Sequence, residues 1–308
     1  DKSKLVLCKK IIEKICKRLK FTILGYRSIP TDNSDLGKTS RSTEPIMEQL
    51  ILVPEKGLVY KELDRKLYLL RNYISNSTAI KYPDLVDDFY FTSLSCRTMV
   101  YKGQLTANQL RNYFLDLKNP DFKSAIALVH SRFSTNTIPK WKLAQPFRCI
   151  AHNGEINTIQ GNLNSWSARE KEIQKRNTLL KKAIFPVTNA ALSDSCNLDR
   201  IIEFFARQGK SLPEIMMMLI PEAYQNDTAM PQFKKDFYEF NEYIMEPWEG
   251  PASLVFTDGV IIGACLDRNG LRPSRYYITD DDCLILSSEC GSLPVAPDKV
   301  LKKERLQP

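Results

Sequence analysis

Apolar residues recur every three or four positions along residues 4–20, so that Leu5, Ile12 and Leu19 share one face of a predicted helix and lysines fill most of the other. A helix that lies on a membrane surface has the same pattern. Amphipathic helices more often pack against a domain, and we expect that here. The same periodicity predicts further helices over residues 61–75, 106–116, 156–182, 198–208, 212–220 and 232–244.

Short apolar or alternating runs predict strands at residues 21–29, 49–53, 89–95, 98–101, 125–133, 148–152, 252–257, 260–265, 275–279 and 283–286. Residues 30–44 are polar and rich in turn formers, which predicts a loop, and Asp258-Gly259 predicts a two-residue hairpin. Strands gather towards both ends of the chain and helices dominate the middle. We therefore expect an α/β (α+β) domain with mostly antiparallel sheets rather than strict βαβ alternation.

The polar residues that are best suited to binding or catalysis lie in residues 130–164. Both histidines of the chain, His130 and His152, fall there, together with Arg132 among hydroxyl residues and a Gln145-Pro146 pair. Such residues are costly to bury unpaired. They lie between or directly after the apolar runs 125–129 and 147–151, which predicts a site held between neighbouring strand ends.

Three positions suggest binding of one small molecule, and each also has a purely structural explanation. The planar fork of Arg132 suits a carboxylate, or else forms a structural ion pair. The amide of Asn153 and the N–H of Gly154 suit a developing oxyanion, although Asn-Gly is also the commonest hairpin turn. Asp194 precedes a predicted helix and suits an ammonium, or else caps that helix. Together they would recognise an L-amino acid and hydrolyse its side-chain amide, but this set contains no nucleophile.

A family resemblance covers nearly the whole chain, and its set of motifs is highly specific. The chain resembles the class II glutamine amidotransferase domain of glutamate synthase at residues 96–103 (CRTMVYKG), 116–120 (DLKNP), 130–137 (HSRFSTNT), 145–146 (QP), 151–157 (AHNGEIN), 189–195 (NAALSDS), 246–252 (EPWEGPA) and 267–273 (DRNGLRP). A shorter part of this pattern is similar to amidophosphoribosyltransferase as well. The long helical insert after residue 155 favours glutamate synthase, and the polar loops resemble its ferredoxin-dependent, cyanobacterial and plastid type.

The resemblance implies a four-layer αββα sandwich of the N-terminal-nucleophile hydrolase type, with residues 1–308 forming a glutaminase domain that is incomplete at its N-terminus. By matching motif, Arg132 would hold the α-carboxylate of L-glutamine and Asp194 its α-ammonium. Asn153 and Gly154 would form the oxyanion hole. The supporting residues would be His130, Ser134 and Thr135.

The family's nucleophile is an N-terminal cysteine whose own α-amino group acts as the base. Position 1 here is Asp, and the catalytic N-terminal strand and the downstream synthase domain are absent from the sequence. Cys8 falls on the apolar face of a predicted helix, where a thiol is expected to be inert. We therefore expect no glutaminase activity from this polypeptide by itself.

Composition and charge narrow the class of protein further. The chain is 43% hydrophobic and 26% charged, which is ordinary for a globular domain. The chain has a net charge of +8, and its basic residues cluster only in residues 9–20 and 171–182. These clusters predict solvated helix faces rather than contacts with nucleic acid or membrane. None of the eight cysteines forms a C-x-x-C pair or has zinc spacing, so we expect a reducing compartment and no metal site. No signal peptide is visible, and no apolar run could span a membrane.

Cofactors and partners follow from the resemblance alone. It implies FMN and a 3Fe-4S cluster, with FAD as a further candidate, in the complete enzyme and none in this chain. It implies ferredoxin and the remainder of a glutamate synthase chain as partners, in the plastid (chloroplast stroma) or in a bacterial cytoplasm. Two alternatives stay open: the glutaminase domain of another class II enzyme such as amidophosphoribosyltransferase, and a non-catalytic module that binds glutamine.

Overall fold

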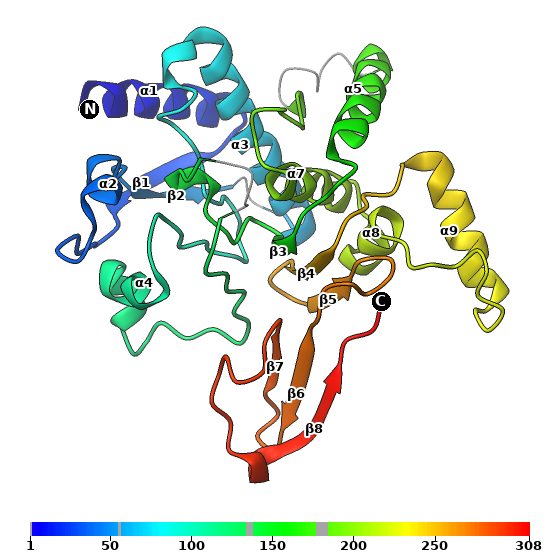
Figure 1. Cartoon of the computed structure of the whole chain (residues 1–308). Helices are drawn as coiled ribbons and strands as arrows, with labels where there is room; N and C mark the ends of the chain where they lie inside the picture. Colours follow the sequence, from blue (N-terminus) through cyan, green and yellow to red (C-terminus); the bar gives the residue numbers. More distant parts are fainter. Residues whose placement is uncertain (1, 55–56, 134–137, 177–183) are drawn as a thin grey trace.

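A computed structural model describes residues 2–54, 57–133, 138–176 and 184–308 (Figure 1). In these residues three small antiparallel sheets combine with helices, in the sheet orders β1-β2, β3-β4-β5 and β7-β6-β8. The mixed α/β architecture with antiparallel sheets that the sequence predicts is therefore confirmed.

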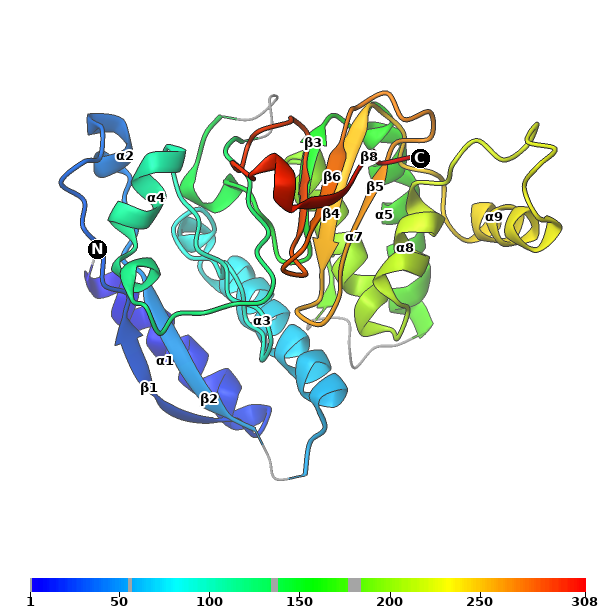
Figure 2. The same ribbon diagram turned by 90° about the horizontal axis from the view of Figure 1, so that it is seen from below.

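The first part of the chain forms a layer of two helices on a hairpin. α1 (Lys2–Arg18) and α3 (Tyr60–Lys81) lie along β1 (Thr22–Ser28) and β2 (Glu48–Val53) (Figure 2). The apolar stripe of α1 is buried with that of α3 in one cluster, which includes Ile12, Cys16, Leu70 and Ile74. The expectation that the basic N-terminal helix packs against the domain is confirmed.

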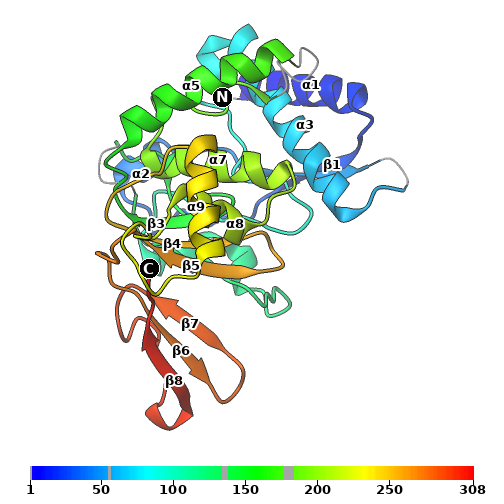
Figure 3. The same cartoon turned by 90° about the vertical axis from the view of Figure 1, so that its right-hand side faces the viewer.

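The central sheet carries the polar motif and the main core. β3 (Ile150–Gly154) pairs with β4 (Ala252–Thr257), and β4 pairs with β5 (Ile262–Leu266). The core lies between this sheet and α5 (Ile159–Arg176), α7 (Asp194–Arg207) and α8 (Leu212–Leu219). α9 (Gln232–Ile244) flanks α8 (Figure 3). Fully buried residues of this core include Ile150, Trp166, Leu198, Ile215 and Leu254.

The third sheet extends away from the helices and contains a strand that the sequence did not predict (Figure 3). β6 (Arg275–Thr279) pairs with β7 (Leu284–Ser287) on one side and with β8 (Val300–Arg305) on the other. β8 is too charged to show an apolar pattern. Its lysines lie over aromatic rings of β6, with the Nζ of Lys303 5.2 Å from the ring centroid of Tyr277. Such cross-strand pairs stabilise a strand with little apolar burial.

Three predicted strands, at residues 89–95, 98–101 and 125–133, are wrong. Where the first two segments meet, the Ser95 hydroxyl accepts the N–H groups of Arg97 and Thr98, and such local bonds compete with a sheet ladder. Residues 125–133 show no ladder in the described part of the chain, and Val129 is 72% exposed. The predicted loop at residues 30–44 contains a short helix, α2 (Lys38–Ser42). The helix predicted at residues 106–116 is divided into α4 (Ala107–Tyr113) and a 3₁₀ turn (Leu115–Lys118).

Candidate functional site

Side chains and a local turn, rather than another strand, bind the outer edge of β3. The carboxylate of Asp199 accepts the N–H of Ile150 at 3.2 Å, and the Phe147 N–H donates to the Ile150 carbonyl at 2.9 Å. Two residues further along, the Gln145 amide accepts the His152 N–H at 2.7 Å and donates to the His152 carbonyl at 2.8 Å. These bonds satisfy the outer edge of β3 at residues 150 and 152 without a further strand.

Gly154 is the next residue whose N–H faces this outer edge. It lies opposite Ala252, which directs its own N–H and carbonyl to Asp267 at 3.0 and 2.9 Å. Opposite residues in an antiparallel ladder alternate between hydrogen-bonded and non-hydrogen-bonded pairs, so the N–H of Gly154 points away from β4. Gly154 also has φ +131°, and a Cβ there would lie 1.8 Å from the Pro251 carbonyl oxygen. Only glycine fits this corner.

Asp194 lies beside the same corner. The N-cap of α7 is Ser193, whose hydroxyl accepts the Cys196 N–H at 3.2 Å, so the alternative that Asp194 caps the helix is wrong. Asp194 accepts the N–H of Ile156, two residues beyond Gly154, at 3.0 Å. Its other oxygen accepts the N–H of Ser195 at 2.6 Å. The carboxylate is thus held next to the Asn153-Gly154 corner by backbone donors.

His152 connects β3 to α7 and stays neutral at neutral pH. Its Nδ1 lies 2.7 Å from the Ser195 hydroxyl, and only 1% of its surface is exposed. Its Nε2 has no hydrogen-bond partner among the described residues. Burial lowers the pKa of His152 to about 4, against the opposing negative charge of Asp194. Because side chains alternate along a strand, Asn153 projects to the opposite face of the sheet from His152.

His130 and Arg132 approach this corner from a segment without regular secondary structure. The Nδ1 of His130 lies 3.0 Å from the backbone nitrogen of Arg132 and 2.9 Å from its carbonyl oxygen. Burial lowers the pKa of His130, while contacts with the backbone of Arg132 and of His152 oppose the shift. His130 thus lies close to His152. Arg132 is exposed, and no ion pair of its guanidinium with a carboxylate is found among the described residues.

The structure therefore brings some of the predicted site residues together and does not show the place of the others relative to them. Asn153, Gly154, Asp194 and His130 lie around one corner at the end of β3. The direction of the Arg132 guanidinium towards that corner stays a prediction. The two hydroxyl residues predicted as supports, Ser134 and Thr135, lie outside the described residues.

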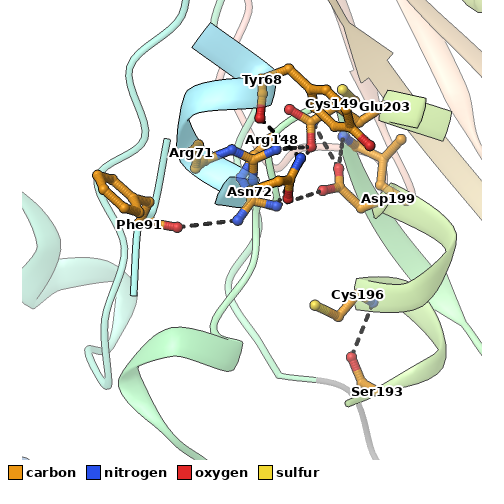
Figure 4. A network of polar contacts seen from close by, with 11 residues as sticks. Tyr68, Arg71, Asn72, Phe91, Arg148, Cys149, Ser193, Cys196, Asp199 and Glu203 are labelled. Carbon is orange, nitrogen blue, oxygen red and sulfur yellow. Dashed lines mark hydrogen bonds and ion pairs between the residues drawn. The ribbon is translucent and has the colours of Figure 1, made fainter. Parts of the chain in front are cut away.

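The sequence analysis missed a buried ionic network behind β3 (Figure 4). Arg71 of α3 pairs with Glu203 of α7 at 2.6 Å, and the Nη1 of Arg148 lies 3.7 Å from both Glu203 and Asp199. Burial disfavours the Glu203 carboxylate, but the guanidinium groups outweigh burial and lower its pKa. Burial raises the pKa of Asp199. A signal was available, since Asp199 and Glu203 are four residues apart on the apolar face that Leu198 and Ile202 define.

Comparison with known sequences decides the family. The profile of a family described as glutamine amidotransferases class-II matches residues 1–308. The chain belongs to this family. The resemblance inferred from the motifs is therefore confirmed, and the Gly154 corner lies within an amidotransferase domain.

The relatives of this amidotransferase chain are glutamate synthases. It is 44% identical over 96% of its length to ferredoxin-dependent glutamate synthase 2 of Synechocystis, covering 19% of that protein. It is 43% identical over its full length to the NADH glutamate synthase of Saccharomyces cerevisiae, covering 14%, and 42% identical over its full length to the chloroplastic ferredoxin-dependent enzyme of Oryza sativa, covering 19%. The chain thus spans less than a fifth of the length of these relatives.

The cysteines and the acidic groups of the amidotransferase chain were compared with the requirements of a nucleophile and of a metal site. Cys8 is buried in α1, and burial raises the pKa of its thiol. All eight cysteines are free thiols. Within the described ranges, no group of three His, Cys, Asp or Glu residues could hold a metal ion, and no helix is long and apolar enough to cross a membrane.

Proposed function

We propose that this chain supplies the glutaminase half-reaction of a glutamate synthase, the hydrolysis of L-glutamine to L-glutamate and ammonia. One observation carries the proposal: the N–H of Gly154 faces the open edge of β3 beside the Asp194 carboxylate. A backbone donor on a rigid strand, close to a fixed negative charge, suits an amide whose oxygen becomes negative while its α-ammonium stays positive. The glutamate synthases among the relatives support the same conclusion.

In this proposal each anchor has one role. The Asn153 side chain and the Gly154 N–H bind the developing oxyanion. Asp194 binds the α-ammonium, because a carboxylate offers about four acceptor sites, and the two backbone N–H groups and the Ser195 hydroxyl that donate to it leave room for another donor. Arg132 binds the α-carboxylate through its guanidinium. The supports are His130, Ser134 and Thr135.

The remainder of the reaction lies with parts of the enzyme outside this chain. We infer that an N-terminal cysteine from outside this chain is the nucleophile, since Cys8 is buried with a raised pKa. With that segment added, the fold would be the αββα sandwich of N-terminal-nucleophile hydrolases. The ammonia would be used to aminate 2-oxoglutarate in a synthase region that holds FMN, a 3Fe-4S cluster and, as a further candidate, FAD. Ferredoxin is the proposed electron donor and the plastid or a bacterial cytoplasm the proposed location, because ferredoxin-dependent relatives come from a cyanobacterium and a chloroplast.

The experiment measures glutamine binding and turnover separately. Calorimetry with L-glutamine on this polypeptide is expected to show binding that Arg132→Ala and Asp194→Ala each weaken about tenfold or more. Arg111→Ala, on the exposed face of α4, is the matched control and is expected to bind like the parent chain. Unchanged affinity in the Arg132 and Asp194 variants would contradict the assigned roles.

Turnover distinguishes the alternatives. In the complete enzyme, Asn153→Ala is expected to lower kcat for ammonia release about 10²–10³-fold, the usual loss for one oxyanion donor. Glutamine binding without ammonia release in the complete enzyme would instead favour a non-catalytic glutamine-binding module. Transfer of the ammonia to a phosphoribosyl acceptor would favour the amidophosphoribosyltransferase alternative.

A further inference from the structure

The hydroxyl of Ser195 connects the Asp194 carboxylate to β3. Its oxygen lies 3.2 Å from one carboxylate oxygen of Asp194 and 2.7 Å from the Nδ1 of His152. The backbone N–H of Ser195 donates to the same carboxylate oxygen at 2.6 Å. Ser195 and His152 are each only 1% exposed, so water does not compete for these contacts. Two buried hydrogen bonds therefore lead from the imidazole on β3 to the proposed ammonium site.

The direction of these two hydrogen bonds follows from the protons that are available. A serine hydroxyl has one proton to donate, and an ionised carboxylate can only accept. The proton between Ser195 and Asp194 therefore belongs to the hydroxyl, so the proton between Ser195 and His152 must belong to the imidazole. Burial lowers the pKa of His152 to about 4, and a neutral imidazole carries a single N–H. That N–H is consequently at Nδ1.

The other tautomer of His152 would leave two groups without suitable partners. With the proton at Nε2, the hydroxyl would have to donate to Nδ1, and the oxygens of Ser195 and Asp194 would lie 3.2 Å apart with no proton between them. The Nε2–H would also be a buried donor, although Nε2 has no hydrogen-bond partner among the described residues. For backbone groups, buried N–H donors without a partner are rarer than acceptors with an unused lone pair. The Nδ1–H tautomer leaves only such a lone pair, at Nε2.

We propose that Ser195 is a positioning residue for the ammonium site, in a relay in which His152 donates to Ser195 and Ser195 donates to Asp194. This inference rests on the proposed function, in which Asp194 binds the α-ammonium of L-glutamine. The imidazole is held on β3 and directs the hydroxyl proton towards the carboxylate, which fixes the rotation of that carboxylate. A carboxylate that is already fixed loses little side-chain freedom when the ammonium binds.

Nitrogen-15 NMR of the histidine side chains tests the relay in the unmodified chain without a ligand. At neutral pH, His152 is expected to have a protonated Nδ1 and an unprotonated Nε2. A His130→Asn variant assigns the signals, because His152 is then the only histidine. A protonated Nε2 would overturn the relay, whether or not the chain binds glutamine and whether or not any Ser195 variant folds.

Titration calorimetry with L-glutamine tests the positioning role. Ser195→Ala removes the hydroxyl but keeps both backbone N–H donors on Asp194, so the affinity is expected to fall about threefold to tenfold, the usual cost of immobilising one side chain on binding. Ser193→Ala is the matched control on the same helix turn, because its hydroxyl caps α7 through the Cys196 N–H. Loss of this cap is expected to lower stability and to leave the affinity unchanged.

A second ligand separates positioning from a general disturbance of the fold. 4-Carbamoylbutanoate has the carboxylate and the amide of glutamine but no α-amino group, so Ser195→Ala is expected to leave its affinity unchanged. Equal glutamine affinities of the unmodified chain and Ser195→Ala, or equal losses for the two ligands, would overturn the positioning role and leave the proposed function standing. If the unmodified chain binds no glutamine, the proposed function and the positioning role both fail, and the NMR result still decides the relay.

Discussion

Acidification tests the environment of His152, the residue that joins β3 to α7. The imidazole is buried, with Nδ1 2.7 Å from the Ser195 hydroxyl and Nε2 without a partner among the described residues. Protonation would place a positive charge where only 1% of the side chain reaches solvent. Burial therefore lowers the pKa of His152 from its ordinary value of 6.5 to about 4.

The sign and size of the effect on stability follow from this shift. Between pH 6.5 and about 4 the unfolded chain binds a proton at His152 that the folded chain does not, so the free energy of unfolding falls as the pH is lowered through this window. At 1.36 kcal/mol per pKa unit, the loss is on the order of 3 kcal/mol. That is a large fraction of the 5–15 kcal/mol typical of a domain. The Glu203 ion pair is also lost on acidification, but only as the pH falls through its own lowered pKa.

Two measurements check this prediction. The chain contains only two histidines, so their imidazole resonances can be separated in NMR spectra. In a His130→Asn variant, the only imidazole resonances that remain are those of His152. Urea unfolding at pH 7.0, 5.5 and 4.5 gives the accompanying loss of stability. A His152 resonance that titrates near pH 6.5 in the folded protein would refute the reasoning.

Three further substitutions test the surroundings of the corner. Gly154→Ala forces a methyl group onto the Pro251 carbonyl at positive φ and is expected to lower the free energy of unfolding by about 3 kcal/mol or more. Gly161→Ala, at an open position of α5, is the control and is expected to change it by about 1 kcal/mol or less. Urea titration of both variants measures the two free energies. Asp199→Asn is expected to cost about 3 kcal/mol and to speed amide exchange at Ile150, and unchanged exchange would argue against its role on β3. Burial opposes the Asp267 carboxylate, but four backbone N–H groups outweigh burial and lower its pKa. Asp267→Asn is therefore expected to destabilise the chain by about 1–2 kcal/mol at pH 7, and by less as the pH falls through the lowered pKa of the wild-type carboxylate. A difference independent of pH would contradict this.

Helices and strands with a clear periodicity of apolar residues could be predicted from the sequence. The predicted bounds of α9, β4 and β6 agree with the structure, and those of α8 agree within one residue. In α7 and α8 the apolar spacing marks the buried face, because Leu198, Ile202 and Ile215 all fall in the main core. The local spacing of apolar residues is enough to predict an element when one face of that element is buried along its whole length.

The remaining elements depend on partners that are distant in the sequence. Residues 125–133 have the apolar composition of a strand but form no ladder, and the side chains of Gln145 and Asp199 rather than a strand bind the outer edge of β3. β8 has a charged sequence and forms because β6 offers both a ladder and aromatic rings. For the candidate site, the motifs predicted Asn153, Gly154 and Asp194, which the structure places around one corner. The motifs did not reveal that Ser193 rather than Asp194 caps α7, because both residue types suit that position.

The geometry of α7 gives a reason for the glycine at position 154. Three side chains of the first turns of this helix bind β3 and its continuation: Asp199 at Ile150, Ser195 at His152, and Asp194 at Ile156. An extended chain from residue 150 to 156 would span about 20 Å, whereas the helix rises only about 7.5 Å from residue 194 to 199. Short aspartate side chains cannot cover the difference of about 12 Å.

The chain must therefore turn sharply after β3, and the positive φ of Gly154 supplies that turn. A side chain at this position would do more than strain one residue, because it would pull Ile156 away from Asp194 and so displace the proposed ammonium site from the Gly154 corner. We expect Gly154→Ala to increase amide exchange at Ile156 as well as to lower stability. Full protection of the Ile156 amide in a destabilised Gly154→Ala chain would show that the turn does not hold Asp194 in place.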